Sequence, residues 1–403
     1  MLIPIASGSD VAAVLTDLFV VLLAAKIGDE ICRRIGQPGL IGEIVAGALI
    51  GPSVLGLVEP GEVLQVFAEV GVVFLLFWVG LETRIGDLRS VGKPAALAGM
   101  LGVIFPFAAG LGLGFAIGEN TASSVFIASA LVATSVGITS AVLMQLGVLD
   151  TKASRTILGA AIVDDILARL LLAFATGLST SKLDVVGLLV TAGLAVAFLT
   201  FFALGGTRAM RARPELLHLP KVPDSALLLA VIGCLGLAAL ANAIGLAAII
   251  GAFLAGLIFS ESKDHYPLEL EIKPLYSFLS PFFFAVIGMS VDLGSFTDGD
   301  TLALLGVTVL LAAATKFAGA WIGALSLGRN EAAFVGLGMI PRGEVGIVVA
   351  GIGRSAGVIG DELFAVIVGM SIVTTLITPP LLRRASRRIA VGGDGLEPPT
   401  LSV

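Results

Sequence analysis

The sequence predicts an all-helical protein that crosses a membrane about thirteen times, judged by hydropathy. Of its 403 residues, 57% are hydrophobic and only 13% are charged, whereas a soluble domain carries about 25% charged residues. The apolar stretches are long enough for spanning helices, which need about 20 residues, and too continuous for the strands of a membrane barrel. The 51 glycines are expected where helices pack closely in lipid.

The spans follow one another with short connections. Their centres lie near residues 22, 48, 73, 106, 134, 166, 194, 233, 253, 281, 313, 342 and 371. Lys and Arg gather in alternate connections, so by the positive-inside rule we expect the N-terminus outside and the C-terminus inside. A bacterial or archaeal plasma membrane is the expected location. Residues 392–403 contain Gly and Pro and are expected to form a disordered tail.

An internal repeat organises the spans. Four pairs of segments match at nearly the same offset: Leu40–Gly47 with Ile249–Gly256, Phe74–Gly80 with Phe282–Gly288, Ala109–Gly110 with Ala318–Gly319, and Val136–Ile138 with Val345–Ile347. The second copy begins an odd number of spans after the first, so it crosses the membrane in the opposite sense. We therefore predict one transporter unit, residues 1–391, built from interleaved inverted repeats at about 11–180 and 224–385.

Two of the repeat-related spans contain residues that break a helix. Thr134–Thr139 places hydroxyls, a β-branched run and a glycine in mid-span, and Pro341–Gly346 places a proline, glycines and two charges there. Unwound backbone at membrane depth is stable only where it is buried in protein or lines a cavity. The half-helix ends then offer carbonyl and amide groups that can hold ions. We predict two crossed discontinuous helices, with two kinked packing helices as the alternative.

Charged residues inside the spans are few. Asp164 and Asp165 are adjacent near the middle of the sixth span, where a charge costs roughly 2.5–3.5 kcal/mol. Neighbours in a helix point in different directions, so this acid pair needs distant partners, water or a cation. Lys316 has no acid nearby on its own span, and the acid pair is its expected partner. Arg342 and Glu344 lie at the second break, where we expect them to neutralise the partial charges of the half-helix ends at the crossing. A purely structural acid pair is the alternative.

One carboxylate that pairs with Lys316 leaves the other available. Beside backbone carbonyls and the hydroxyls of Thr134, Ser135 and Thr139, an ionised carboxylate can bind a dehydrated monovalent cation, whereas a protonated one cannot. Competition between a proton and a cation for one site is sufficient for antiport, provided that the site opens to one side at a time. The sequence contains no nucleophile–base constellation, metal motif or phosphate loop, so an enzyme is not expected, nor is any cofactor beyond the transported ions.

These residues resemble the sodium/proton antiporters of the monovalent cation/proton antiporter superfamily, and specifically the NapA-like members of its second branch. The resemblance covers nearly the whole chain and rests on motifs in the same order: Gln37-Pro38, Ile41-Gly42-Glu43, Ala46-Gly47, Gly51-Pro52, Phe77, Gly80-Leu81-Glu82-Thr83, Ala133–Thr139, Ala160-Ala161, Asp164-Asp165, Thr315-Lys316 and Pro341–Gly346. It implies the NhaA/NapA-like fold, with inverted repeats and crossed discontinuous helices.

The resemblance also implies an electrogenic sodium (or lithium)/proton antiporter that serves pH homeostasis. It would work as a homodimer by an elevator mechanism. A dimerisation domain that includes the spans near 48 and 253 stays fixed. A core domain, with the spans near 73, 106, 134 and 166 and their repeat mates, moves. The position matching Asp165 carries Na⁺ and H⁺ alternately, and the position matching Asp164 forms a switching ion pair with the one matching Lys316.

Arg169 departs from the family pattern, which usually has a small or apolar residue at this position. It lies four residues after Asp165 and therefore on the same helical face. It can pair with Asp165 and weaken cation binding, or it can extend by snorkelling toward the outer interface, to which it is one turn closer. We expect the second arrangement.

Three other functions share parts of this pattern. A potassium/proton antiporter has the same fold. A ligand-gated channel is expected to carry a cytosolic nucleotide-binding domain, and an organic-anion symporter is expected to lack a buried cation–acid pair such as Lys316 with Asp164. The expected partners are membrane lipid, monovalent cations, protons and a second copy of the chain, without nucleic acid.

Overall fold

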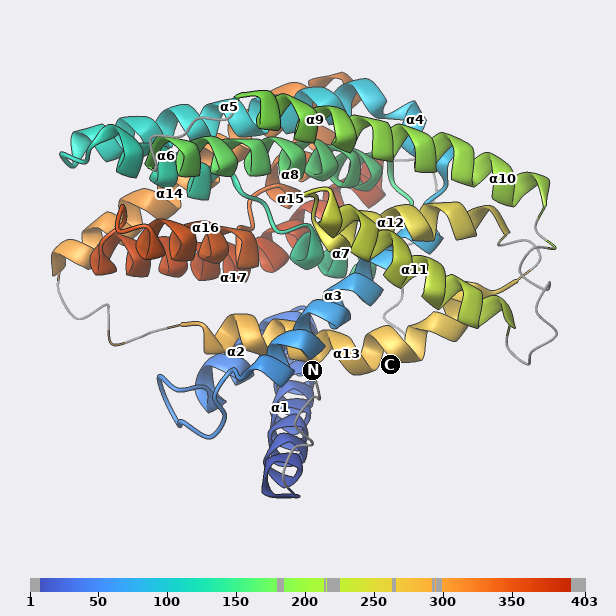
Figure 1. Cartoon of the computed structure of the whole chain (residues 1–403), viewed down its shortest axis with the longest axis horizontal. Helices are drawn as coiled ribbons and strands as arrows, with labels where there is room; N and C mark the ends of the chain where they lie inside the picture. Colours follow the sequence, from blue (N-terminus) through green and yellow to red (C-terminus); the bar gives the residue numbers. More distant parts are fainter. Residues whose placement is uncertain are drawn as a thin grey trace.

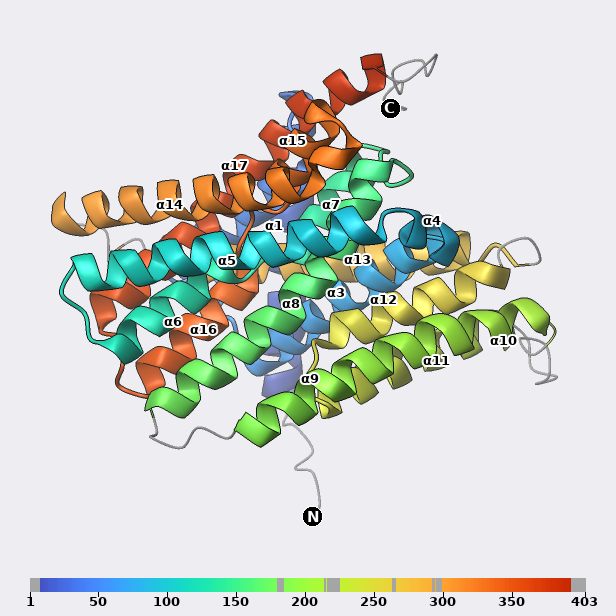
Figure 2. The same cartoon turned by 90° about the horizontal axis from the view of Figure 1, so that it is seen from above.

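The structure of the chain, a computed structural model, describes residues 8–179, 185–213, 215, 225–262, 266–291, 294 and 299–392. Every regular element in these ranges is a helix, as the sequence predicts. Most of the helices run side by side along the long axis of the molecule (Figures 1 and 2). The predicted disordered tail lies outside the described residues, except for Gly392, which ends the last helix.

The helices of the first half of the chain are α1 Gly8–Arg34, α2 Gly39–Ile50, α3 Glu62–Glu82, α4 Ile85–Ser90, α5 Gly92–Ala116, α6 Thr121–Val132, α7 Val136–Gln145, α8 Lys152–Ser179, α9 Val185–Thr200, the π-helix η1 Phe201–Gly206 and α10 Thr207–Ala212. Those of the second half are α11 Ser225–Ala243, α12 Ala248–Phe259, η3 Ser260–Ser262, α13 Leu268–Met289, α14 Gly299–Ala324, η5 Leu325–Leu327, α15 Arg329–Gly338, α16 Gly343–Ser355 and α17 Asp361–Gly392.

The helices account for the thirteen predicted spans. Within the described ranges, nine helical segments are long and apolar enough to cross a membrane, counting α6 with α7 as one segment. Three shorter apolar segments correspond to α2, α12 with η3, and α16. The remaining span is α8, which is 28 residues long and carries the adjacent aspartates.

Close contacts at glycines reproduce the internal repeat. A Cβ atom added at Gly47 on α2 would lie 2.1 Å from the carbonyl oxygen of Ala285 on α13. One added at Gly256 on α12 would lie 2.2 Å from the carbonyl oxygen of Phe77 on α3. The sequence repeat matches Gly47 with Gly256 and Phe77 with Ala285, so the same backbone contact occurs once in each copy. Only glycine lets the helix backbones approach this closely.

The helices pack in two groups. In the first group, α2 and α12 pack against α13 and α3, with α1 on α2 and α11 on α12. The second group contains α5, α6, α8 and α14 to α17, and α5 and α14 lie side by side along their length (Figure 2). The resemblance implies that α3 belongs with α5 to the core domain. In the structure, α3 packs mainly against α12 and α13 of the first group. Its tight backbone contact with α12 at glycine explains this packing.

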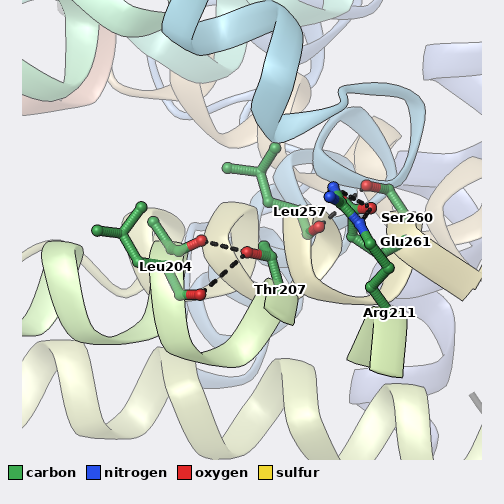
Figure 3. A network of polar contacts seen from close by, with 7 residues as sticks. Leu204, Thr207, Arg211, Leu257, Ser260 and Glu261 are labelled. Carbon is green, nitrogen blue, oxygen red and sulfur yellow. Dashed lines mark hydrogen bonds and ion pairs between the residues drawn. The ribbon is translucent and has the colours of Figure 1, made fainter. Parts of the chain in front are cut away.

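An ion pair between Arg211 and Glu261 joins the segment between the two repeats to the end of α12. After η1, the short helix α10 carries Arg211 to the end of α12, as Figure 3 shows. The Arg211 Nε and Nη2 atoms donate to one carboxylate oxygen of Glu261 at 2.9 and 2.7 Å. The Thr207 hydroxyl turns back onto carbonyls of η1 (Figure 3). The linker is therefore fixed to the first group of helices.

Candidate functional site

The two breaks touch each other. The backbone N–H of Ser135 donates to the carbonyl of Pro341 at 2.8 Å, and the hydroxyl of Thr139 donates to the carbonyl of Gly338 at 2.7 Å. Gly343 has a φ of +46°, and a Cβ atom added to it would lie 2.6 Å from the Ser135 side chain. A residue with a side chain would be strained here and would push the breaks apart. The predicted crossing of two discontinuous helices is confirmed.

At each half-helix that ends at this crossing, the terminal carbonyls accept hydrogen bonds from a buried, positively charged side chain. Lys316 on α14 donates from Nζ to the carbonyl of Val132, the last residue of α6, at 2.7 Å. Arg342 donates from Nη1 to the carbonyls of Met339 and Ile340, just after α15, at 3.3 and 3.1 Å. Both side chains are fully buried. Because the C-terminal end of a helix carries partial negative charge, these cations stabilise the two ends.

Asp164 forms an ion pair with Lys316. The Lys316 Nζ contacts Oδ1 of Asp164, and both side chains are almost completely buried. The guanidinium of Arg342 also interacts electrostatically with Asp164. The second carboxylate oxygen, Oδ2, has no hydrogen-bond partner in the described part of the chain. Asp164 therefore offsets part of the positive charge of Lys316 and Arg342 at the crossing.

Asp165 turns to a different set of partners. Its Oδ2 accepts a hydrogen bond from Nε of Arg169 at 3.0 Å. The backbone amide of Ala247, directly before α12, is a further hydrogen-bond partner of the carboxylate. Arg169 also makes a long contact of 3.4 Å, from Nη1 to the carbonyl of Gly245. The two adjacent aspartates thus face two separate environments, one at the crossing and one at the connection between α11 and α12.

The expectation that Arg169 extends toward the outer interface is wrong. Its side chain folds back along α8 onto Asp165, one turn earlier. The spacing of four residues brings the two groups together on one helix face. Pairing offsets the cost of a buried, ionised carboxylate, because an unpaired charge is expensive inside a protein and extension toward the interface would leave Asp165 without that compensation.

The first break contributes a buried hydroxyl, that of Thr134. Thr134 is 5% exposed, and its Oγ1 atom has no hydrogen-bond partner among the described residues. Ser135, next to it, is fully buried. Leaving a buried oxygen unsatisfied costs about 1–3 kcal/mol. Hydroxyl and carboxylate oxygens are the ligands that hard cations prefer, and the Thr134 hydroxyl and the Asp164 Oδ2 atom are both of this kind and both lack a hydrogen-bond partner among the described residues. The side chain of Glu344, the other predicted charge at the crossing, lies outside the described part of the structure.

The interface between the two helix groups contains a small cavity near the aspartates. A small pocket lies between α3, α7, α8 and α12, and α8 contributes Leu158, Ala161 and Ile162, which precede Asp164. Its volume of about 20 Å³ has room for a single water molecule. All of its lining residues are apolar, so the pocket provides no polar ligands for a cation.

The partners that sequence reasoning missed are backbone groups. The carbonyls of Val132 and Gly245 and the amide of Ala247 contact the charged side chains. Every residue has such groups, so no residue type marks their positions. Only Gly245, which has a φ of +84°, had a visible signal, because such a backbone favours glycine at a tight turn.

Several known proteins with similar sequences are named as antiporters that exchange sodium ions for protons. A family model described as "Sodium/hydrogen exchanger, transmembrane" matches residues 19–385. The Na⁺/H⁺-K⁺ antiporter GerN of Bacillus cereus is 35% identical over 366 residues, which cover 90% of this chain and 94% of GerN. A Na⁺/H⁺ antiporter of Enterococcus hirae is 34% identical over 381 residues, or 92% and 98% of the two chains.

A solved structure has the same fold. The sodium proton antiporter MjNhaP1 of Methanocaldococcus jannaschii, determined at pH 8, superposes with a TM-score of 0.65. The alignment covers 94% of this chain and 98% of MjNhaP1, at 16% sequence identity. At this identity the likeness supports the helical architecture alone.

Proposed function

Because the chain belongs to the sodium/hydrogen exchanger family, we propose that it exchanges sodium ions for protons, with Asp165 as the alternating carrier. The main support is the pair of buried aspartates beside the crossing of two discontinuous helices. Asp164 is tied to the fully buried Lys316. The ion-pair partner of Asp165 is Arg169, whose side chain is 36% exposed. Of the two carboxylates, Asp165 therefore has the partner that can be displaced.

Exchange follows from competition for oxygen atoms. In this proposal an ionised Asp165 that has left Arg169 offers its carboxylate oxygens to Na⁺, and the Thr134 hydroxyl, which has no partner among the described residues, serves as a further oxygen ligand. A protonated Asp165 has lost its negative charge and releases the ion. Asp164 adds a second carboxyl group that can take up a proton when Lys316 turns wholly to the Val132 carbonyl. Two protons against one sodium ion would make the exchange electrogenic.

The two helix groups support an elevator mechanism. In this proposal the first group, which includes α2, α3, α12 and α13, forms the fixed part and the contact between two copies of the chain. The second group carries the crossing and both aspartates and moves against it. The assignment of α3 and its repeat mate α13 to the fixed part follows from their packing and replaces their placement in the moving core.

Potassium is the second candidate ion. The relative GerN is named as a Na⁺/H⁺-K⁺ antiporter, and oxygen ligands such as those of Thr134 and Asp165 suit either ion. Selectivity then depends on the geometry of the ligands when an ion is bound.

The test is cation-dependent proton flux in proteoliposomes, with Na⁺, Li⁺ and K⁺ compared in parallel. Asp165→Asn should abolish the flux while the protein remains folded, because the variant removes the titratable carrier. The control is Asp150→Asn, which removes an exposed carboxylate just before the same helix and should leave the flux unchanged. Flux with Na⁺ that persists in Asp165→Asn would refute the assignment. An imposed membrane potential should change the rate if the exchange is electrogenic.

A further inference from the structure

We propose that Arg169 is a tethered cation that competes with the transported ion for Asp165 and ties α8 to the connection between α11 and α12. The proposal rests on the proposed role of Asp165 as carrier. It assigns Arg169 as a residue that positions Asp165 and sets the affinity of the site for cations.

The Asp165 carboxylate already accepts hydrogen bonds from two donors. The Arg169 guanidinium and the Ala247 amide both donate hydrogen bonds to the carboxylate. A sodium ion needs the lone pairs of the same oxygen atoms. It would also stand next to the guanidinium, and two positive charges repel strongly in a buried site of low dielectric constant. Sodium binding at Asp165 therefore requires that Arg169 move away.

Arg169 is placed so that it can move. Its side chain is 36% exposed, whereas that of Asp165 is 4% exposed, so the guanidinium approaches the carboxylate from the more open side. A long flexible side chain of this kind can extend along the helix without moving the backbone. Lys316 differs in each respect, because it is fully buried and bonded to both Asp164 and the Val132 carbonyl. The cation beside Asp164 is thus enclosed in the protein, whereas the cation beside Asp165 lies on the more exposed side and can be displaced.

The same side chain bridges the two groups of helices. Arg169 belongs to α8 of the second group, and the Gly245 carbonyl belongs to the turn before α12 of the first group. The Ala247 amide, in the same turn, reaches the carboxylate as well. When a proton or a sodium ion takes the place of the guanidinium, this bridge between the groups is lost. Loading of the site is thereby coupled to the release of α8 from α12.

A purely structural ion pair makes a different prediction. It would change the stability of the protein and leave the affinity for Na⁺ and its dependence on pH as they are. The test therefore compares wild type, Arg169→Leu and Arg169→Lys in proteoliposomes. The two readouts are the Na⁺ concentration that gives half-maximal exchange at alkaline pH and the pH at which exchange is half-maximal. Arg155→Leu is the control, because it removes an arginine that pairs with Asp150 at the start of the same helix.

Removing a fixed positive charge beside a carboxylate strengthens the binding of every cation, the proton included. Arg169→Leu should therefore lower the half-saturating Na⁺ concentration about tenfold and shift the pH profile by about one unit to the alkaline side. Arg169→Lys keeps the charge and should stay close to wild type, as should Arg155→Leu. Since Arg169→Leu can fail to fold, Arg169→Gln is measured with it, because glutamine keeps a polar side chain without the charge.

The purified proteins give a second readout that does not need flux. The Na⁺ concentration that half-saturates thermal stabilisation should fall about tenfold in Arg169→Leu or Arg169→Gln. Unchanged half-saturation and an unchanged pH profile in both variants, with Na⁺-dependent flux present in wild type, would overturn this inference alone. Wild-type protein without cation-dependent flux would overturn the proposed function, and this inference with it.

Discussion

Removing the Lys316 charge should strongly destabilise the protein. Lys316→Met keeps an unbranched apolar stem and removes the ammonium group, so Asp164, which is 1% exposed, loses its ion pair and the Val132 carbonyl loses its donor. Breaking a buried ion pair costs about 3–5 kcal/mol, and a buried carbonyl left unsatisfied adds about 1–3 kcal/mol. The free energy of unfolding should therefore fall by about 4–8 kcal/mol, or by less if Asp164 takes up a proton. Asp164→Asn, which leaves Lys316 charged and unpaired, should cost about 3–5 kcal/mol.

The double variant distinguishes a direct interaction between Asp164 and Lys316 from two independent effects on stability. Asp164→Asn with Lys316→Met leaves neither charge of the pair, so its loss should be smaller than the sum of the single losses by at least about 2 kcal/mol. The assay is unfolding in mixed detergent micelles, with all variants at one pH. The control cycle uses Arg354 and Asp361, which are 2.7 Å apart but 50% and 84% exposed, and should give a coupling of about 0.2–1 kcal/mol. Additivity at Asp164 and Lys316 within about 0.5 kcal/mol would refute the reasoning.

Two further predictions concern the helix contacts and the first break. Gly256→Ala should destabilise the fold by about 3 kcal/mol, because the new Cβ would lie 2.2 Å from the Phe77 carbonyl oxygen. Gly236→Ala, whose Cβ would meet no atom within 4 Å, should leave the unfolding free energy almost unchanged, and equal losses in the two variants would contradict the packing argument. Thr134→Val should leave stability unchanged or raise it by up to about 1 kcal/mol, since the Thr134 hydroxyl has no partner in the described chain. The same variant should weaken Na⁺ activation of exchange, and unchanged activation would show that Thr134 is not a ligand.

The fold was largely predictable because its main features leave local signs in the sequence. Spans of apolar residues mark the helices, and the glycine-containing matches mark the inverted repeat, whose two copies make the same backbone contact at Gly47 and Gly256. The break before α16 was predictable from Pro341, and the break before α7 from the hydroxyls and Gly137. The grouping of α3 was not predictable in this way, because an apolar helix in lipid carries no sign of which apolar neighbour it contacts.

Asp164, Asp165 and Lys316 could be found from the sequence because a charge in an apolar span is costly wherever the helix packs. Which aspartate pairs with Lys316 follows from the resemblance to known antiporters, and the structure places Asp164 there. Physical reasoning on the sequence alone could not decide this, because the answer depends on how α8 is rotated against α14.

The direction in which the Arg169 side chain points could not be predicted from the sequence alone. Its spacing from Asp165 permits both a pair on one helix face and extension to the interface, and the two differ in free energy only through the surroundings of Asp165. Those surroundings are the Gly245 carbonyl and the Ala247 amide, about eighty residues further along the chain. The sequence by itself determined which groups are costly to bury, because that cost belongs to the residue type. Only the tertiary structure decided which groups offset the cost, because the partners are backbone atoms and distant side chains that packing brings together.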